Sequence, residues 1–175
     1  MNGDFEILIV DDEQAQRETL AGFLRKKGFG VSSAGGFNEA VEAVKTSYFD
    51  LVITDFQMPD GTGYDLLKEI KSYNPAIAVV IITAYGTIDT AVSAMRDGAF
   101  DYIQKPVNLN ELLFKIESIR EKQFLISENS MLKAALAKKY SFDSIVSQSG
   151  EMEEALSTAA RVAKSKAAVM VLGES

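Results

Sequence analysis

Five polar side chains stand directly after short apolar runs of the sequence, and their types suit a divalent cation and a phosphoryl group. Asp11 and Asp12 follow one run, Asp55 follows another, and Thr83 and Lys105 follow two more. If the runs are strands of an open parallel α/β sheet, these side chains share its carboxyl edge, where ligands bind in such sheets. Three carboxylates, a hydroxyl and an ammonium group in one cleft would bind Mg²⁺ and phosphoryl oxygens.

Asp55 is the candidate nucleophile, because a carboxylate can attack a phosphoryl group and hold it as an acyl phosphate. That step gathers negative charge beside Asp11 and Asp12, which is favourable only if a cation is present. We therefore expect these two carboxylates, Asp55 itself and the backbone carbonyl of Gln57 to hold Mg²⁺, which prefers oxygen ligands.

Lys105 and Thr83 complete the expected site. Lys105 would pair with Asp55 or with a phosphoryl oxygen, and the Thr83 hydroxyl would donate to another phosphoryl oxygen. Simpler explanations exist for each residue. Asp11 and Asp12 could cap a helix that starts just after them, Asp55 and Lys105 could be solvated loop residues, and a threonine at a strand end is ordinary. Their coincidence at four predicted strand ends favours the functional interpretation.

The elements that must position these residues alternate along the chain. Short runs rich in Val and Ile predict strands, and amphipathic patterns predict helices between them, which indicates a doubly wound parallel sheet covered on both faces. We expect Gly28, Pro75 and Gly98 to end helices, and a turn at 61–63. The predicted strands are Phe5–Val10, Phe29–Ser33, Leu51–Thr54, Ala78–Ile82 and Ala99–Ile103, and the predicted helices are Gln14–Lys27, Asn38–Thr46, Gly63–Tyr73 and Thr87–Arg96.

After Pro106, one long helix is predicted from Leu109 to about Lys139. Its first three turns are expected to pack on the sheet. Beyond about Gln123 the sheet has ended, so the remaining apolar residues need another partner, for which we expect a second copy of the chain. Some apolar positions follow heptad spacing, but the register slips between 123 and 130. The candidate dimer and linker residues are Leu112, Ile116, Ile119, Ile126, Leu132 and Leu136.

The composition excludes several kinds of function. The net charge is −7 and Lys and Arg form no cluster, which argues against nucleic-acid binding by this segment. The chain has no Cys and no His, which excludes disulfides, thiolate or imidazole zinc sites and a phosphohistidine on this chain. No apolar stretch reaches the roughly 18–20 residues that span a bilayer, and the first residues are unlike a signal peptide. We therefore expect a cytoplasmic protein with no membrane partner.

Four segments carry a more specific signal: VDDE at 10–13, TDFQMPDG at 54–61, ITAYG at 82–86 and YIQKP at 102–106. In this order they resemble the motifs of response-regulator receiver domains of two-component signalling, over about residues 4 to 122. The resemblance implies an α/β fold of the flavodoxin-like (CheY-like) kind, with a doubly wound five-stranded parallel sheet.

The resemblance also implies residue roles. Asp55 would be the phosphoacceptor, Mg²⁺ would lie among Asp11, Asp12, Asp55 and the Gln57 carbonyl, the phosphoryl group would contact Thr83, Ala84 and Lys105, and a cis bond would precede Pro106. Thr83 and Tyr102 would form a switch pair. On phosphorylation Thr83 would move inward, Tyr102 would fill the space it leaves, and the neighbouring face with the 87–96 helix would repack.

The last segment resembles a second family. Residues 145–149, Met152 and 169–175 are similar to the opening of the AAA+ domain of NtrC-type activators of sigma-54 RNA polymerase. Gly173–Ser175 would begin a Walker A loop, but its later Gly, Lys and Ser/Thr are missing, so we expect no ATP binding and no enzyme activity from this chain. The elements predicted here are an apolar run at 142–146, a helix over Glu151–Lys164 and a strand over Ala167–Leu172.

The expected organisation is a receiver domain at 1–122, a linker helix at 123–139 continuous with the last receiver helix, and a truncated AAA+ fragment at 140–175. The resemblance implies that a sensor histidine kinase phosphorylates Asp55 and so regulates homodimerisation and the output of a sigma-54-type transcriptional activator. Contact with sigma-54 RNA polymerase and DNA would need domains missing here. The alternative is a degenerate receiver that only dimerises, which would normally have lost some of Asp12, Asp55, Thr83 and Lys105; all four are present.

Overall fold

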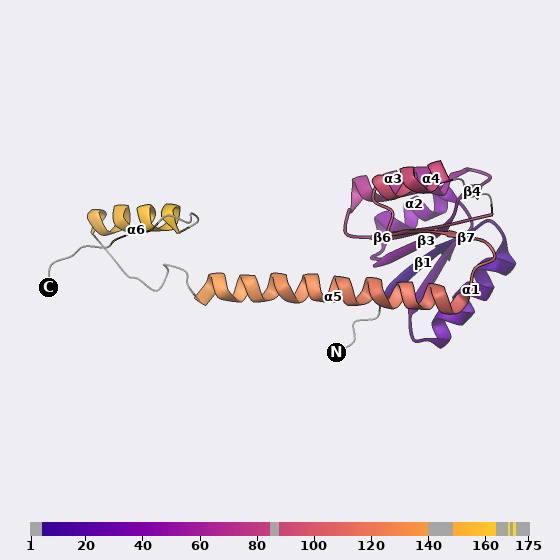
Figure 1. Ribbon diagram of the computed structural model, residues 1–175, viewed down its shortest axis with the longest axis horizontal. Coiled ribbons are helices and arrows are strands. Elements are labelled where there is room, and N and C mark those ends of the chain that lie inside the picture. The colour runs from indigo at the N-terminus through magenta and orange to yellow at the C-terminus, as the bar shows by residue number, and fades with distance from the viewer. Residues whose placement is uncertain (1–4, 85–87, 140–148, 164–167, 169, 171–175) are drawn as a thin grey trace. The chain divides into compact units, whose positions relative to one another are not determined.

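The computed structural model describes residues 5–84, 88–139, 149–163, 168 and 170, with side chains described as far as 134 in the long helix (Figure 1). The chain divides into two compact units, Met1–Phe124 and Leu125–Ser175. The first unit contains the sheet and the candidate site. The predicted boundary near residue 140 falls at a stretch outside the described residues.

Five parallel strands form the main sheet, in the order β2-β1-β3-β6-β7. This is the doubly wound, flavodoxin-like arrangement that the sequence predicted. The bounds differ slightly, most of all in β7, because the N–H of Ala99 still bonds to the carbonyl of Ala94 in the preceding helix. The strands are β1 (Glu6–Val10), β2 (Gly30–Ala34), β3 (Leu51–Asp55), β6 (Ala78–Thr83) and β7 (Asp101–Gln104).

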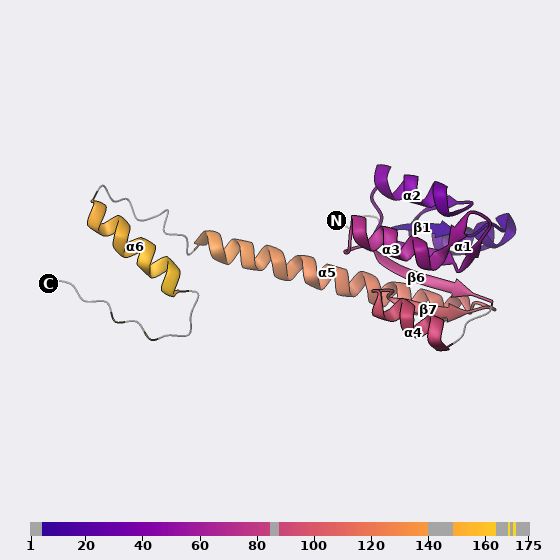
Figure 2. The same ribbon diagram turned by 90° about the horizontal axis from the view of Figure 1, so that it is seen from above.

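The inner strands serve two separate cores. Ile7 and Ile9 of β1 face one core and Leu8 and Val10 the other, as the two-residue period of a strand requires. Because both sets are buried, the strand reads as a continuous apolar run. One face is covered by α1 (Gln14–Lys26) and α5 (Leu109–Lys139), and the other by α2 (Phe37–Thr46), α3 (Gly63–Tyr73) and α4 (Ile88–Arg96), as Figures 1 and 2 show.

Two glycines end helices where the chain enters a left-handed conformation. Gly28, after α1, has φ +88°, and Gly98, after α4, has φ +94°. Residues with a Cβ rarely adopt such angles, which glycine adopts without strain. Both helix ends were predicted and are confirmed, and each glycine leads the chain back toward the next strand.

The helix α5 belongs to the core only in its first part. Leu112, Ile116 and Ile119 are at most 1% exposed and pack against strand side chains of their own sheet. Their side chains are covered within the first unit, as expected for the first turns of this helix, and their role as dimer or linker residues stays a prediction. Ile126 and Leu132 lie farther along α5 and are 60% and 59% exposed.

Gln123 marks where α5 leaves the sheet. Its Nε2 donates to the carbonyls of Asp50 at 3.0 Å and Ala76 at 3.4 Å, so the helix is tied to the amino edge of the sheet at this point. The side chain of Leu136, another predicted dimer residue, lies outside the described side chains. Beyond Gln123, large apolar side chains are exposed on α5: Phe124, Leu125, Ile126, Met131 and Leu132.

A small hairpin after β3 was not predicted. Gln57–Met58 (β4) pairs antiparallel with Gly61–Thr62 (β5), where the sequence indicated only a turn. The hairpin leads directly into α3. It therefore lies between the candidate nucleophile and the helix that follows it.

The second unit contains one further described helix, α6 (Gly150–Val162), close to the helix predicted at Glu151–Lys164. The predicted run at 142–146 and most of the predicted strand at 167–172 lie outside the described residues. None of the described helices is long and apolar enough to cross a membrane.

Candidate functional site

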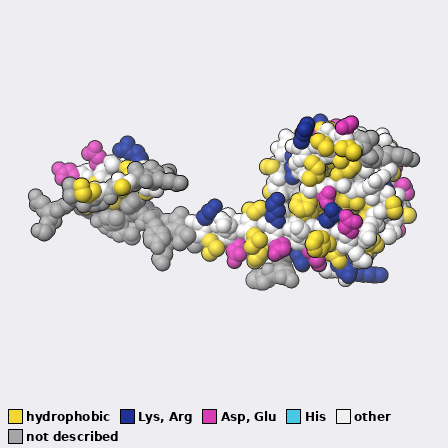
Figure 3. Space-filling model, in the orientation of Figure 1, with side chains coloured by type: hydrophobic (Ala, Val, Ile, Leu, Met, Phe, Trp, Pro, Cys, Tyr) yellow, Lys and Arg dark blue, Asp and Glu magenta, His cyan; other side chains and the backbone are white. Residues whose placement is uncertain are grey.

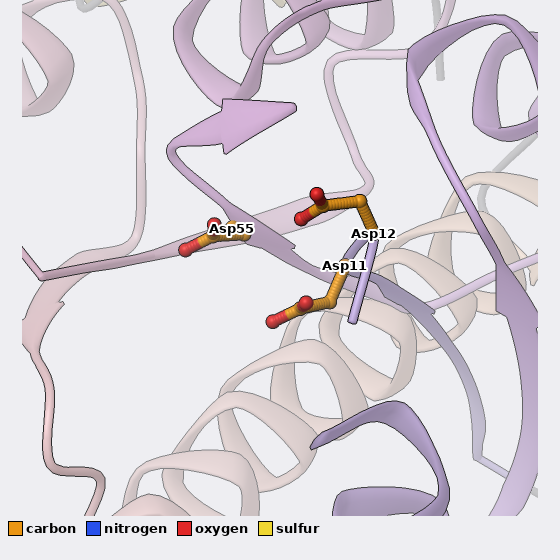
Figure 4. A group of neighbouring side chains, drawn as sticks. All are labelled: Asp11, Asp12 and Asp55. Carbon is orange, nitrogen blue, oxygen red and sulfur yellow. The ribbon is translucent and has the colours of Figure 1, made fainter. Parts of the chain in front are cut away.

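Three carboxylates meet at the carboxyl edge of the sheet. Asp11 and Asp12 follow β1, Asp55 ends β3, and oxygens from all three lie within 4.8 Å of one another. Figure 4 shows the three side chains directed to the same side. The parallel pairing of β1 with β3, in which Val10 lies opposite Thr54, brings the two strand ends together. The predicted convergence of these residues is therefore present in the structure.

Lys105 joins this cluster from the segment between β7 and α5. Its Nζ lies 3.0 Å from Asp55 Oδ1 and 3.3 Å from Asp11 Oδ2. The backbone N–H of Lys105 donates to the Thr83 carbonyl at 2.7 Å, which holds the segment against the end of β6. The peptide bond from Lys105 to Pro106 is cis. One ammonium group thus lies among three carboxylates.

The charges explain how the site titrates. Burial raises the pKa of Asp55, and the hydrogen bond and charge of Lys105 lower it without cancelling this effect, while the charge of Asp11 raises it further. Burial alone would lower the pKa of Lys105, but its contacts with Asp55 and Asp11 outweigh burial and raise it. One ammonium group against three carboxylates leaves two negative charges unbalanced. A divalent cation with a preference for oxygen ligands, such as Mg²⁺, fits this donor set.

Helix capping does not explain the acidic pair. The residue at the N-cap of α1 is Glu13, whose side chain makes no cap hydrogen bond. Asp11 Oδ1 accepts the Glu13 N–H at 2.8 Å, and Asp11 Oδ2 faces Lys105, while Asp12 is exposed. Arg17, which the sequence did not single out, donates from Nη1 to the Asp11 carbonyl at 2.5 Å. This bond from α1 fixes the loop that carries the two carboxylates.

The loop that carries Gln57 is held on both sides. The N–H of Phe56 donates to the Ile82 carbonyl at 2.7 Å, and the N–H of Gly63 donates to the Phe56 carbonyl at 2.8 Å. A Cβ at Gly63 would lie 2.3 Å from the carbonyl oxygen of Asp55, so only glycine fits there. Gln57 itself stands on β4, two residues after Asp55, and its carbonyl stays a candidate metal ligand.

The predicted switch residues lie on neighbouring strands. Thr83 ends β6 and is 2% exposed, and it is followed by the exposed Ala84. Tyr102 lies on β7, where its hydroxyl is 3.2 Å from Thr90 Oγ1 of α4 and its ring meets that of Phe56 edge to face at 6.3 Å. The sequence did not single out Phe56 or Thr90; its only signal was an aromatic residue directly after the candidate nucleophile. These contacts connect the end of β3 with α4.

Residues 7–117 match the family described as response regulator receiver domain. The transcriptional regulatory protein ZraR of Escherichia coli O157:H7 is 37% identical over 172 residues, which are 98% of this chain and 38% of ZraR. The chain therefore spans about two-fifths of the length of this curated relative.

Two solved structures extend the comparison. The beryllofluoride-activated NtrC4 receiver domain dimer is similar with a TM-score of 0.65 and 32% identity, over 67% of this chain and 98% of that one. NtrX from Brucella abortus in complex with ADP is similar with a TM-score of 0.68 and 34% identity, over 92% of this chain and 34% of that one. The similarity therefore covers the sheet unit and, in NtrX, continues beyond it.

Proposed function

The chain belongs to the response regulator receiver domain family and is homologous over its length to NtrC-type two-component regulators, and from this premise we propose that Asp55 accepts a phosphoryl group from a sensor histidine kinase. The observation that carries the proposal is the cluster itself. Oxygens of Asp11, Asp12 and Asp55 lie within 4.8 Å of one another, and the Lys105 ammonium lies 3.0 Å from Asp55. An acidic site of this kind fits a phosphoacceptor pocket.

In the proposed transfer, a carboxylate oxygen of Asp55 attacks the phosphorus of the kinase phosphohistidine. The oxygen–phosphorus bond forms, the phosphorus–nitrogen bond breaks, and the electron pair stays on the imidazole nitrogen. The product is an acyl phosphate on Asp55. Lys105 then pairs with a phosphoryl oxygen, because the negative charge moves from the carboxylate to the phosphoryl group. The chain keeps the group on its own side chain, so we propose an acceptor rather than an enzyme with a separate substrate.

Asp11, Asp12, Asp55 and the carbonyl of Gln57 would hold Mg²⁺. When bound, this cation supplies the positive charge that the carboxylates lack, which phosphoryl transfer requires. The support is the charge balance of the cluster and its all-oxygen donor set. Arg17 contributes by holding the Asp11 carbonyl, which keeps the acidic pair at this edge of the sheet.

A route from the site toward α4 follows from the contacts of Tyr102. With a phosphoryl group on the acceptor, the Thr83 hydroxyl, the Ala84 backbone and Lys105 would contact its oxygens. Thr83 would turn inward, and Tyr102 would move into the space and give up its 3.2 Å contact with Thr90. The phosphoryl group brings a charge of about −2 and new acceptor oxygens. Because these contacts exist in only one of the two conformations, phosphorylation shifts the population between them.

We further propose that phosphorylation regulates pairing of two chains through the receiver and the exposed part of α5, and thereby the output of a sigma-54-type transcriptional activator in the cytoplasm. Ile126 and Leu132 are 60% and 59% exposed, so α5 offers apolar surface to a second copy. The NtrC4 receiver is described as a dimer in its beryllofluoride-activated form. Polymerase and DNA contacts would belong to other domains of the full regulator.

Labelling by a small phosphodonor tests the function. With acetyl phosphate and Mg²⁺, the chain should gain the mass of one phosphoryl group, and tandem mass spectrometry should place it on Asp55. A folded chain that gains no such mass would contradict the proposal. If that chain still dimerised in sedimentation, the degenerate receiver that only dimerises would become the better description.

A further inference from the structure

The carboxylate of Asp60 ties the hairpin after Asp55 to the start of α2. Its Oδ1 accepts the N–H of Phe37 at 2.8 Å, and its Oδ2 accepts the N–H of Asn38 at 3.0 Å and the side-chain amide of Asn38 at 3.1 Å. Phe37 and Asn38 open α2, and the N-cap position is Gly36, which makes no side-chain cap. Asp60 therefore supplies, from another element, the cap that α2 lacks.

Two glycines permit this close approach. A Cβ at Gly36 would lie 2.6 Å from Asp60 Oδ1, and a Cβ at Gly61 would lie 2.7 Å from the ring of Phe37. Both distances are shorter than any ordinary carbon contact, so a side chain at Gly36 would displace the Asp60 carboxylate and one at Gly61 would displace the Phe37 ring. The hairpin and the start of α2 therefore pack closely around the Asp60 carboxylate.

The same hairpin carries Gln57. In the antiparallel ladder Gln57 pairs with Thr62, and Met58 pairs with Gly61. This short ladder transmits the position of the turn to β4. Its other end is held where the Gly63 N–H bonds to the Phe56 carbonyl, beside the acceptor. The position of Asp60 therefore helps to fix the backbone of Gln57 relative to the three carboxylates.

We propose that Asp60 is a positioning residue for the metal and phosphoryl site, which acts by holding the Gln57 carbonyl in place through α2. The inference rests on the proposed function, because it assumes that this carbonyl contributes to Mg²⁺ binding. Asp60 itself is outside the acidic cluster and touches no reacting atom. Loss of an outer partner of a metal ligand costs about 10- to 100-fold in metal affinity. Since Asp60 acts through the hairpin, we expect the lower end, about tenfold.

The test is the Mg²⁺ dependence of labelling by acetyl phosphate in the full chain. In Asp60→Asn the half-saturating Mg²⁺ concentration should rise about tenfold, while the labelling rate at saturating Mg²⁺ stays close to that of the wild type. A residue that only stabilised the fold would lower the melting temperature without separating these two quantities.

Glu39→Gln is the matched control. Glu39 also holds the start of α2, but through a hydrogen bond from the N–H of Gly35 at 2.6 Å instead of one to the hairpin. This variant should lose stability without a change in the half-saturating Mg²⁺ concentration. Equal Mg²⁺ dependence in the wild type and Asp60→Asn, or an equal shift in both variants, would overturn the role of Asp60.

The outcomes distinguish failure of the Asp60 positioning role from failure of the proposed phosphoacceptor function. A wild-type chain that takes no label contradicts the phosphoacceptor proposal, whereas a labelled wild type with an indifferent Asp60→Asn contradicts only the positioning role. If circular dichroism shows that Asp60→Asn does not fold, Asn38→Ala provides the test of the positioning role. That variant removes only the 3.1 Å side-chain bond to Asp60. A smaller shift in the same direction supports the role, and no shift overturns it.

Discussion

Lys105 Nζ lies 3.0 Å from Asp55 Oδ1, and this ion pair joins the end of β3 to the segment before α5. The two side chains are only 20% and 13% exposed, so solvent screens the pair partly. The charge of each group therefore depends on the other. The predictions about the site follow from this dependence.

Asp55→Asn should abolish labelling by acetyl phosphate, because an amide cannot serve as the attacking carboxylate. The measurement is the intact mass after incubation with the phosphodonor and Mg²⁺. Asp65→Asn is the control, since Asp65 lies in the first turn of α3 outside the acidic cluster, and it should label like the wild type. Labelling of Asp55→Asn at the wild-type rate would refute the nucleophile assignment.

Lys105→Met should lower the free energy of unfolding of the metal-free chain by about 2 kcal/mol, because it leaves two partly buried carboxylates without their cation. Urea unfolding at neutral pH measures the loss. Lys45→Met is the control, since Lys45 pairs with Glu69 at 3.1 Å on the surface, where such a pair contributes only about 0–1 kcal/mol. If the two variants lost the same stability, Lys105 would not be balancing the acidic site.

Mg²⁺ should raise the free energy of unfolding, because it binds the folded cluster and not the unfolded chain. At ten times the dissociation constant the gain is about 1.4 kcal/mol. Asp12→Asn should reduce this gain, and EDTA should stop labelling of the wild type. An equal Mg²⁺-induced rise of the melting temperature in the wild type and Asp12→Asn would remove Asp12 from the proposed ligand set, and no rise in the wild type would contradict the metal site itself.

Cutting the chain after Gln123 should weaken dimerisation, because it removes the exposed apolar part of α5. A double variant, Ile126→Ser with Leu132→Ser, should raise the dimer dissociation constant about a hundredfold or more, since each buried side chain contributes about 1.5–3 kcal/mol. Sedimentation with and without beryllofluoride measures it. Glu128→Gln, on the same stretch of helix, is the control. A dimer unchanged by the truncation would show that this part of α5 is not the interface.

The hydrogen bonds of Asp60 to the start of α2 should make part of the free energy of unfolding dependent on pH. Its bonds to the Asn38 and Phe37 N–H groups lower the pKa of Asp60 below the ordinary value of 3.8. A carboxyl group with a lowered folded-state pKa stabilises fully above its unfolded value, and the contribution is lost as pH falls through the lowered value. The difference in unfolding free energy between the wild type and Asp60→Asn should therefore be constant above about pH 5 and shrink toward pH 2. A difference that stayed constant over that range would show that the Asp60 carboxylate does not stabilise the fold through these hydrogen bonds.

The inner strands could be predicted because they are buried on both faces. β1 from Ile7 to Val10 and β6 from Ala78 to Ile82 read as unbroken apolar runs for this reason. Edge strands give weaker patterns: β2 has the exposed Ser32 and Ser33, and β7 has polar residues at both ends. The two-residue strands β4 and β5 are too short to show any period, so the hairpin was missed.

The acidic residues and Lys105 could be predicted because each follows a strand, and strand ends of a parallel sheet share one edge. The roles of Arg17 and Asp60 could not be predicted, because each side chain bonds to a part of the chain outside its own helix or hairpin. No local sequence pattern shows which helix contacts which loop. The division of α5 could be predicted, because the length of the strands limits how many helix turns can pack on the sheet. Ile116 is buried on the sheet, and Ile126, beyond Gln123, is exposed.

The two helices that follow Asp55, the proposed phosphoacceptor, are held unequally on the same face of the sheet. Toward α3 Asp55 adjoins Gly63 with no room for a side chain, and that helix also buries Leu66, Leu67 and Ile70. The next helix, α4, packs on the same face and buries only Ala94. At about 1.5–3 kcal/mol per large buried side chain, displacing α3 costs several kcal/mol more than displacing α4. If Asp55 is phosphorylated as proposed, we therefore expect α4 to move before α3 does, so the direction of the change would be set by the unequal burial of the two helices.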